Sequence, residues 1–494
     1  MRVSSGCPSL LDYARIASGC SVEIEEKVLE GVASSRSRYL EEVSRRKVYG
    51  YSTGVGALQG KAGEFDPEIL LVEHASGVGG YLEEDAARAV MAVRIVQLSR
   101  GHSPVRRDVV EHLAEMLNRG VVPAIPIYGS VGASGDLAPL AHLALAATGR
   151  GRAWYGGRLL PAAEALEAAG LRPLRIERGE ALSLINGTAF STGLLLYSAA
   201  KLAALVTVWM RAIGLGVALS TCNLEHYEPE TVQLKRHRYP ETLLEELWRA
   251  ASSLGRKGAG SGDRLQDPYS LRCVPQVVGA FYVAWRHAAE VAVCEACSPS
   301  DNPVVTASGV RHQCSFHGVH VALAADYLAI AAAALANAAE RRIAHLLASG
   351  PPGREFLGGG ESPSGMMMAH YTAASRSAYI RQLAAPHSVH NIPTSELQED
   401  YVSMSANAAL RVLDVYDALL DIAAVELAVA ARLALLWGVE VEGYGGVQEA
   451  VSNLGKATIS EMVATARAAL EAEVSNVVKS AAYPREFDVA CPHA

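Results

Sequence analysis

The 494-residue sequence lacks the marks of a secreted or membrane-embedded chain. Its first residues carry no apolar run of the signal-peptide kind. A membrane span needs about 20 apolar residues with few charges. Charges interrupt the longest apolar stretches here, with Lys201 and Arg211 inside residues 189–219 and Asp326 inside residues 320–338. We therefore expect these stretches to be buried helices of a soluble, cytoplasmic protein with no membrane partner.

The sequence also lacks a surplus of basic residues and a convincing set of metal ligands. It has 44 basic and 52 acidic residues and a net charge of −8, without the clustered Lys and Arg of a nucleic-acid groove. Among its 8 cysteines only Cys294 and Cys297 show a suggestive spacing, and no second pair accompanies them. We expect no metal, no nucleic-acid partner, and reduced thiols packed in the core at these two positions.

The elements that are present change in character along the chain. Before residue 190 short β-like runs such as residues 152–160 lie between helical patterns, one of which covers residues 83–99 and ends before Gly101. After residue 189 the segments are Ala- and Leu-rich and longer than the average globular helix. Long helices are predicted over residues 189–219, 274–296, 317–348, 364–383, 404–437 and 460–481.

This pattern predicts a mainly α fold. We expect a smaller mixed N-terminal domain over residues 1–190, followed by a bundle of long helices over residues 191–494. Low charge and many alanines suit helices that are surrounded by other helices. Several helices are apolar on most faces, so we also expect the chain to form an oligomer.

The most informative short segment is the tripeptide Ala133-Ser134-Gly135, which is flanked by small residues. Small neighbours let the backbone bend sharply and approach itself. The Gly135 nitrogen is then able to reach the Ala133 carbonyl carbon, and loss of water with the Ser134 hydroxyl creates an electrophile, which no natural side chain supplies well. The tripeptide by itself is more typical of an ordinary loop that starts a helix.

A second segment, residues 266–273, holds an amide, a carboxylate, a phenol and a guanidinium. Pro268 favours a helix start at this point, which would place Tyr269 and Arg272 on one helical face. An Arg fork binds a carboxylate through two hydrogen bonds. A substrate clamp and a surface Arg–Asp pair explain this segment equally well.

Three more polar residues stand at glycine- or turn-rich points of the chain. Tyr49 precedes a Gly-rich loop that lacks the lysine and spacing of a phosphate-binding loop. Asn186 stands at a turn before the first long helix, and Glu399 lies in a polar stretch before another. Each of these segments, taken singly, is more typical of a plain turn or of a helix start with an acidic residue.

Together and in this order, the segments between about residues 48 and 404 resemble the aromatic amino-acid ammonia-lyase family. The resemblance implies that Ala133-Ser134-Gly135 cyclises autocatalytically to 4-methylidene-imidazol-5-one, so that no external cofactor is needed. It also implies a fumarase/aspartase-like helical fold and a homotetramer whose active sites are shared between subunits. The reaction implied removes ammonia from a small-molecule amino acid without oxidation.

The resemblance further implies roles for single residues. Tyr49 matches the base that removes the β-proton, and Arg272 matches the clamp for the substrate carboxylate. Asp136 is expected to assist cyclisation and to cap the helix that follows it. Tyr269 is grouped with the catalytic residues. The other matching positions, around the prosthetic group and the substrate, are Asn186, Gln266 and Phe316.

His74 and Glu399 bear on the choice of substrate, because they match residues that face the substrate ring in the histidine-specific members. A carboxylate accepts a hydrogen bond from an imidazole N–H, whereas beside a phenyl ring it would be buried unpaired. We therefore expect L-histidine as substrate, with trans-urocanate and ammonia as products. Glu73 and His370 depart from the family pattern and keep other readings open: a lyase for tyrosine, phenylalanine or a modified histidine, or a 2,3-aminomutase. A lyase without a prosthetic group and a non-enzymatic scaffold fit the motifs less well.

Overall fold

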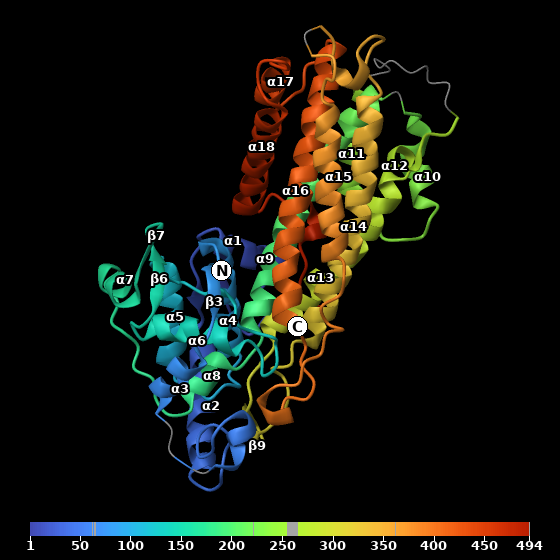
Figure 1. The fold of residues 1–494 in the computed structure, drawn as a ribbon. Helices are drawn as coiled ribbons and strands as arrows, with labels where there is room; N and C mark the ends of the chain where they lie inside the picture. Colours follow the sequence, from blue (N-terminus) through green and yellow to red (C-terminus); the bar gives the residue numbers. More distant parts are fainter. Residues whose placement is uncertain (62, 64–65, 221, 254–264, 361, 494) are drawn as a thin grey trace.

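The computed structural model describes residues 1–494 apart from 62, 64–65, 221, 254–264, 361 and 494. Figure 1 shows a bundle of long helices and, beside one end of it, a smaller part made of short helices and strands. The prediction of a mainly α, long-helix fold is confirmed. The long helices are α9 (Ala189–Leu219), α13 (Val274–Cys297), α14 (Val319–Leu347), α15 (Met367–Leu383), α16 (Ser405–Leu436) and α18 (Ile459–Ser480).

The bundle forms because these helices bury apolar side chains on most of their faces. Two described helices, α9 and α14, are long and apolar enough to cross a membrane by length and composition alone. However, 89% of the most apolar window of α9 and 61% of that of α14 are buried inside the chain. The charges that interrupt the apolar runs are accommodated locally: the Lys201 ammonium lies 4.3 Å from the ring centre of Tyr416, and Arg211 pairs with Glu473 at 3.1 Å. α9 is therefore a core helix of the bundle.

The N-terminal part contains most of the short elements. Its helices are α1 (Leu10–Ala17), α2 (Glu26–Val43), α3 (Pro67–His74), α4 (Glu84–Ser99), α5 (Arg107–Asn118), α6 (Leu137–Ala147), α7 (Ala162–Ala168) and α8 (Glu180–Ile185). Its strands are β1 (Arg2–Val3), β2 (Glu23–Ile24), β3 (Val78–Tyr81), β4 (Val122–Pro123), β5 (Pro126–Tyr128), β6 (Arg152–Tyr155) and β7 (Arg158–Pro161).

The strands form small sheets rather than a layer of their own. β1 pairs with β2 in parallel, β3 pairs with β5 antiparallel, and β6 lies between β4 and β7 in an antiparallel sheet. The β-like run predicted over residues 152–160 is the β6–β7 hairpin. It turns at Gly156 and Gly157, both at positive φ, as a two-residue hairpin loop requires.

The remaining elements are α10 (Pro229–Gln233), α11 (Glu241–Ser253), α12 (Tyr269–Arg272), α17 (Gly445–Ser452), β8 (Val304–Thr306) and β9 (Gly309–Arg311), with 3-10 turns at η1 (Gly56–Gly60), η2 (Leu224–Tyr227), η3 (Glu355–Leu357), η4 (Ser395–Leu397) and η5 (Arg485–Phe487). β8 and β9 form an antiparallel pair that packs against α2, and η1 contacts η4. α1 and α4 pack against α9, so the N-terminal part shares one hydrophobic core with the bundle. The domain division at residue 190 stays a prediction.

The expectation of reduced thiols is wrong for Cys294 and Cys297, the two cysteines that prompted it. Cys297 is bonded to Cys7, and Cys294 to Cys491, with Cα–Cα distances of 5.6 and 4.8 Å. The partners lie 290 and 197 residues away along the chain, so local spacing gave no sign of them. The two bonds fasten segments near both ends of the sequence to the last turn of α13.

We predict that reduction of these two disulfides destabilises the protein. A long closed loop restricts the unfolded chain, and each bond is worth about 2–4 kcal/mol. Urea unfolding should therefore give a lower free energy of unfolding in the presence of a thiol reductant. Cys20→Ser, which changes an unpaired and exposed cysteine, should leave the stability and its sensitivity to reductant unchanged. Alkylation of all 8 cysteines in the unreduced, denatured protein would contradict the pairing.

Candidate active site

The tripeptide Ala133-Ser134-Gly135 lies in the loop between β5 and α6. Gly135 has φ +70°, and a Cβ there would lie 2.4 Å from the Gly187 carbonyl oxygen. Gly132 has φ +66°, and a Cβ there would lie 2.2 Å from the Ser403 hydroxyl. Only glycine fits these two positions, because the backbone is left-handed and the neighbouring chain is in contact. The loop is therefore bent sharply on both sides of Ser134.

The segment that follows α8 holds the tripeptide in place. The fully buried Asn186 donates from Nδ2 to the Ser134 hydroxyl oxygen at 2.8 Å and to the Ser134 carbonyl oxygen at 3.1 Å. Beside these two hydrogen bonds, the Asp136 backbone N–H donates to the Gly187 carbonyl oxygen at 2.7 Å. We call these contacts, between residues 186–187 and 134–136, the clasp.

Asp136 precedes α6, but its side chain does not cap that helix, so this prediction is wrong. Its buried carboxylate instead accepts hydrogen bonds from the Ser130 hydroxyl at 2.9 Å and from the backbone N–H and hydroxyl of Ser191 at 2.8 and 2.9 Å. Ser191 lies in the first turn of α9, whose free N–H groups attract an anion. Burial raises the pKa of Asp136, and these hydrogen bonds oppose the rise. The carboxylate thus ties the loop to the start of α9.

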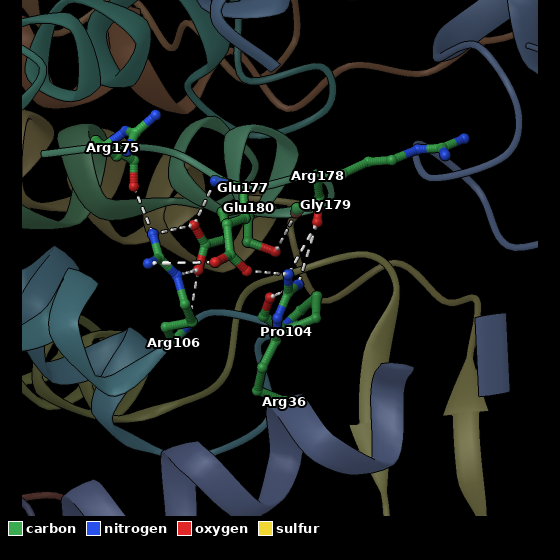
Figure 2. A network of polar contacts seen from close by, with 9 residues as sticks. Arg36, Pro104, Arg106, Arg175, Glu177, Arg178, Gly179 and Glu180 are labelled. Carbon is green, nitrogen blue, oxygen red and sulfur yellow. Dashed lines mark hydrogen bonds and ion pairs between the residues drawn. The ribbon is translucent and has the colours of Figure 1, made fainter. Parts of the chain in front are cut away.

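A buried ion-pair network, shown in Figure 2, anchors the other end of α8. Glu180 is its first residue and is fully buried. Its carboxylate accepts from the Arg106 backbone N–H and Nε at 2.9 Å each, and from the Glu177 backbone N–H at 2.7 Å. Arg36 binds the Pro104 and Arg178 carbonyl oxygens from below. Because α8 has only 6 residues, fixing its first residue also fixes Asn186 at its end.

α8 also contacts the loop that carries Tyr49. A Cβ on Gly50 would lie 2.2 Å from a Leu182 methyl carbon, so the loop lies directly on α8. The Tyr49 hydroxyl oxygen accepts from the Gly56 backbone N–H at 2.7 Å. Burial and the nearby Glu399 carboxylate raise the pKa of Tyr49, and only the Gly56 hydrogen bond lowers it. Within one chain, the phenol is therefore held in its neutral form.

A cavity of about 350 Å³ brings several of the predicted residues together. Ser134, which is 8% exposed, opens into this cavity. A second hollow of about 490 Å³ shares part of its lining and includes Phe316. The predicted residues that line the first cavity are Tyr49, Glu73, His74, Ser134 and Glu399.

Two of these side chains have defined partners. His74 is the last residue of α3, and its Nδ1 lies 2.7 Å from the Leu70 carbonyl oxygen, which leaves Nε2 as the other polar atom of the ring. Glu399 accepts a hydrogen bond from the Thr394 hydroxyl at 2.6 Å. Glu73 is more exposed than His74 but lines the same cavity. The acidic and imidazole groups thus lie on the walls around Tyr49 and Ser134.

Sequence reasoning missed some residues of the lining. Thr53 and Ser395 line the first cavity, and His312 lines the second. Thr53 follows Tyr49 in the Gly-rich loop, and Ser395 precedes Glu399 in the polar stretch, so both lay within segments already singled out. The His312 ring nitrogen Nε2 accepts from the Tyr49 backbone N–H at 3.2 Å. No local pattern marks His312.

The segment of residues 266–272 does not reach this cavity within one chain. Gln266 is exposed, Tyr269 is 72% exposed, and the Arg272 guanidinium lies 4.8 Å from the Tyr269 ring centre. The prediction that Pro268 precedes a helix with Tyr269 and Arg272 on one face is confirmed by α12. Figure 1 shows α12 toward the end of the bundle away from α6 and α8. Among the described residues Arg272 forms no ion pair.

His370, which departs from the family pattern, also lies outside the cavity lining. Its Nε2 lies 2.6 Å from the Glu340 carboxylate, and the Arg341 guanidinium contacts the same carboxylate. The structure therefore explains His370 by a contact with the Glu340 carboxylate rather than by substrate contact within this chain.

The residues around the tripeptide fit the ring-forming group that the sequence implies. Asn186 binds the Ser134 hydroxyl, glycine at position 135 leaves room for close approach, and the Asp136 carboxylate is held by Ser130 and Ser191. Asn186 Oδ1 is buried and has no hydrogen-bond partner among the described residues, which leaves an acceptor beside the tripeptide. Asn186 and Asp136 are the residues positioned to hold such a group. Across the ranges that the structure describes, no cluster of three or more His, Cys, Asp or Glu side chains suits a metal ion.

The fold and the clasped loop are those of a helical carbon–nitrogen lyase. The family model described as "Aromatic amino acid lyase" matches residues 9–453, and the chain belongs to that family. A relative named "Probable histidine ammonia-lyase", from Thermoplasma acidophilum, is 39% identical over 82% of this chain and 83% of its own length.

Solved structures share the fold over the whole chain. The phenylalanine aminomutase of Pantoea agglomerans is 27% identical with a TM-score of 0.83, and the match covers 99% of both chains. The histidine ammonia-lyase of Trypanosoma cruzi is 26% identical with a TM-score of 0.83, covering 100% of this chain and 99% of its own.

We predict that the network at the start of α8 is a main source of local stability. Glu180→Ala leaves Arg106 without its buried carboxylate and should lower the free energy of unfolding by about 3–5 kcal/mol. Glu177→Ala removes a neighbouring carboxylate whose side chain is 52% exposed, and should cost at most about 1 kcal/mol. Urea unfolding of both variants measures the difference. Equal losses of unfolding free energy would show that burial of Glu180 is not the source of the network's stabilising effect.

Proposed function

We propose that the protein is a histidine ammonia-lyase that converts L-histidine to trans-urocanate and ammonia. The observation that carries this proposal is the cavity in which Glu399 and His74 lie together with Tyr49 and Ser134. The histidine ammonia-lyase names of the curated relatives, at about 40% identity, support the same substrate. The prosthetic group proposed is 4-methylidene-imidazol-5-one formed from Ala133-Ser134-Gly135.

The proposed roles follow from the low reactivity of the substrate's amine and of its β-hydrogen. The prosthetic ring supplies an electrophile that makes the amine a better leaving group. Tyr49 then removes the β-proton at its phenolate oxygen, which requires an ionised phenol. Among the residues that the structure describes, the Gly56 N–H is the one group that favours that ionised form. We propose that further positive charge near Tyr49 comes from another subunit or from the bound substrate.

The substrate ring is proposed to lie against Glu399 and His74. The Glu399 carboxylate is available to accept a hydrogen bond from an imidazole N–H, and the His74 ring faces the same space. A phenyl ring offers these groups no partner, so their desolvation would be uncompensated. Glu73 adds a second carboxylate on this wall, which strengthens the preference for a basic or hydrogen-bonding ring.

We further propose a homotetramer whose active sites are shared. Arg272, with Gln266 and Tyr269, is the proposed carboxylate clamp, and in one chain it does not line the cavity. α14 exposes an apolar stripe at helical spacing, with Leu323 56%, Tyr327 45% and Ile330 46% exposed. Such a stripe favours burial against another copy, so another subunit is proposed to supply the clamp.

The cytoplasm is the proposed location. Disulfides are rare there, but they persist inside the cells of hyperthermophiles. The two pairs found here are therefore compatible with this proposal.

The second candidate function is a 2,3-aminomutase. It is favoured by the likeness to the phenylalanine aminomutase structure, which covers 99% of this chain. That likeness is at 27% identity, whereas the histidine ammonia-lyase relatives reach 39–41%. A β-amino acid product would identify the mutase.

We predict that the purified protein releases urocanate and ammonia from L-histidine faster than it acts on L-tyrosine or L-phenylalanine. The intact mass should lie about 36 Da below the encoded mass, because two waters are lost. Ser134→Ala should keep the encoded mass and the helical circular-dichroism spectrum, yet lose activity by orders of magnitude. Absorbance and chromatography of the products give the measurement. A correctly cyclised protein that forms no urocanate would overturn the proposed substrate.

We predict that Glu399→Gln affects both specificity and the pH profile. Turnover of L-histidine should fall by about tenfold or more, and any side reaction with L-phenylalanine should fall less. Loss of a carboxylate near Tyr49 lowers the pKa of the phenol. Since the phenolate is the active form, the rise of kcat/KM with pH should move to lower pH.

Glu396→Gln, an exposed neighbour outside the cavity lining, is the matched control and should change neither property. Equal losses with both substrates in Glu399→Gln would remove Glu399 from the specificity role.

A further inference from the structure

A buried polar cluster lies beneath residues 186–188, and no role described so far uses it. Arg94 and Gln97 come from neighbouring turns of α4, and Glu295 comes from the last turn of α13. Arg94 is fully buried, and Gln97 is 1% exposed. Burying a guanidinium costs free energy unless its donors are satisfied, so the contacts of Arg94 are informative.

Arg94 binds the C-terminal end of α8. Its guanidinium donates to the carbonyl oxygen of Ser183, to that of Asn186 at 3.0 Å, and to Gln97 Oε1 at 3.2 Å. The last carbonyls of a helix have no partner within the helix, and a cation there is favoured by the helix dipole. Burial lowers the pKa of Arg94 to about 10, while Asp301 and Asp136 oppose the change. The guanidinium is therefore charged at neutral pH.

The other two residues fix Thr188, at the far side of the same segment. The Thr188 hydroxyl donates to Glu295 Oε1 at 2.7 Å and accepts from Gln97 Nε2 at 3.1 Å. Arg94 and Gln97 also bind each other. Residues 186 and 188 are thus held by one connected set of hydrogen bonds from Arg94, Gln97 and Glu295.

Gly187, between them, lies directly against Arg94 and Ser300. A Cβ at Gly187 would lie 2.6 Å from an Arg94 nitrogen and 2.5 Å from the Ser300 hydroxyl oxygen. Gly187 is also part of the clasp, because its carbonyl oxygen accepts from the Asp136 N–H at 2.7 Å. A displacement of Arg94 therefore moves the residues that hold the tripeptide.

We propose that Arg94, supported by Gln97, is a positioning residue for closure of the prosthetic ring. This inference rests on the proposed function. In the closure, the Gly135 nitrogen bonds to the Ala133 carbonyl carbon. The carbonyl oxygen leaves as water with the hydrogens of the Gly135 and Ser134 nitrogens, and the Ser134 hydroxyl leaves as water with the Cα hydrogen. Neither loss requires an oxidant, so geometry decides the rate.

The test follows ring closure by intact mass over time after synthesis of the full chain. Arg94→Met removes the charge and the carbonyl contacts, and Arg94→Lys keeps the charge. We expect the Met variant to lose two waters about tenfold to a hundredfold more slowly than the wild type, and the Lys variant to be partly rescued.

Arg88→Met is the matched control. Arg88 lies on the same helix and is 5% exposed. It also binds main-chain carbonyls, those of Ile16, Leu117 and Cys20. Its loss should lower thermal stability without slowing ring closure in the folded fraction.

Gln97→Leu keeps the volume without the bonds to Thr188, and it replaces Arg94→Met as the decisive variant if the latter fails to fold. We expect a slower loss of water in Gln97→Leu as well. Ring closure at the wild-type rate in the folded fraction of Arg94→Met, or of both Gln97→Leu and Arg94→Lys, would overturn the inference. A wild-type chain that never becomes lighter would instead overturn the proposed function, so the two failures are distinguishable.

Discussion

The chemistry proposed for this chain depends on the clasp between residues 186–187 and 134–136. Asn186 holds the Ser134 hydroxyl at 2.8 Å, and Gly187 holds the Asp136 N–H at 2.7 Å. Glycine at positions 135 and 187 is what lets the two backbones approach so closely. The neighbouring helices hold the residues of this contact. Asn186 follows α8, Ser191 of α9 binds Asp136, and Arg94 of α4 binds the Asn186 carbonyl oxygen.

The bundle provides the rigidity that such a contact needs. Its helices bury apolar side chains, and some of the charges inside them are paired. The Arg342 guanidinium and the Glu426 carboxylate form two hydrogen bonds, at 2.6 and 2.8 Å, between α14 and α16. Removing one partner of such a pair leaves a buried charge, which is far more costly than the pair is stabilising. The pair therefore holds α14 and α16 together within the bundle.

Much of the fold could be predicted from the sequence, because apolar content and length are local properties. The helix predicted over residues 189–219 has the observed bounds, and those predicted from 274 and 404 begin within one residue of the observed starts. The helix-cap prediction for Asp136 and the reduced-thiol prediction for Cys294 and Cys297 were wrong for a shared reason. Each side chain binds a partner far away in the sequence: Asp136 binds Ser191 of α9, Cys297 is bonded to Cys7, and Cys294 is bonded to Cys491.

The sequence by itself determined the class of chemistry, because a reactive tripeptide, a phenol and a carboxylate are specified by residue type and by order along the chain. Only the tertiary structure decided which of these groups meet. It brought Tyr49, His74, Ser134 and Glu399 to one cavity and left Arg272 outside it. It also decided the role of Arg94, which lies within an unremarkable apolar helix. The physical reason is that hydrogen bonds between distant segments depend on how the helices pack, and packing is a property of the whole chain.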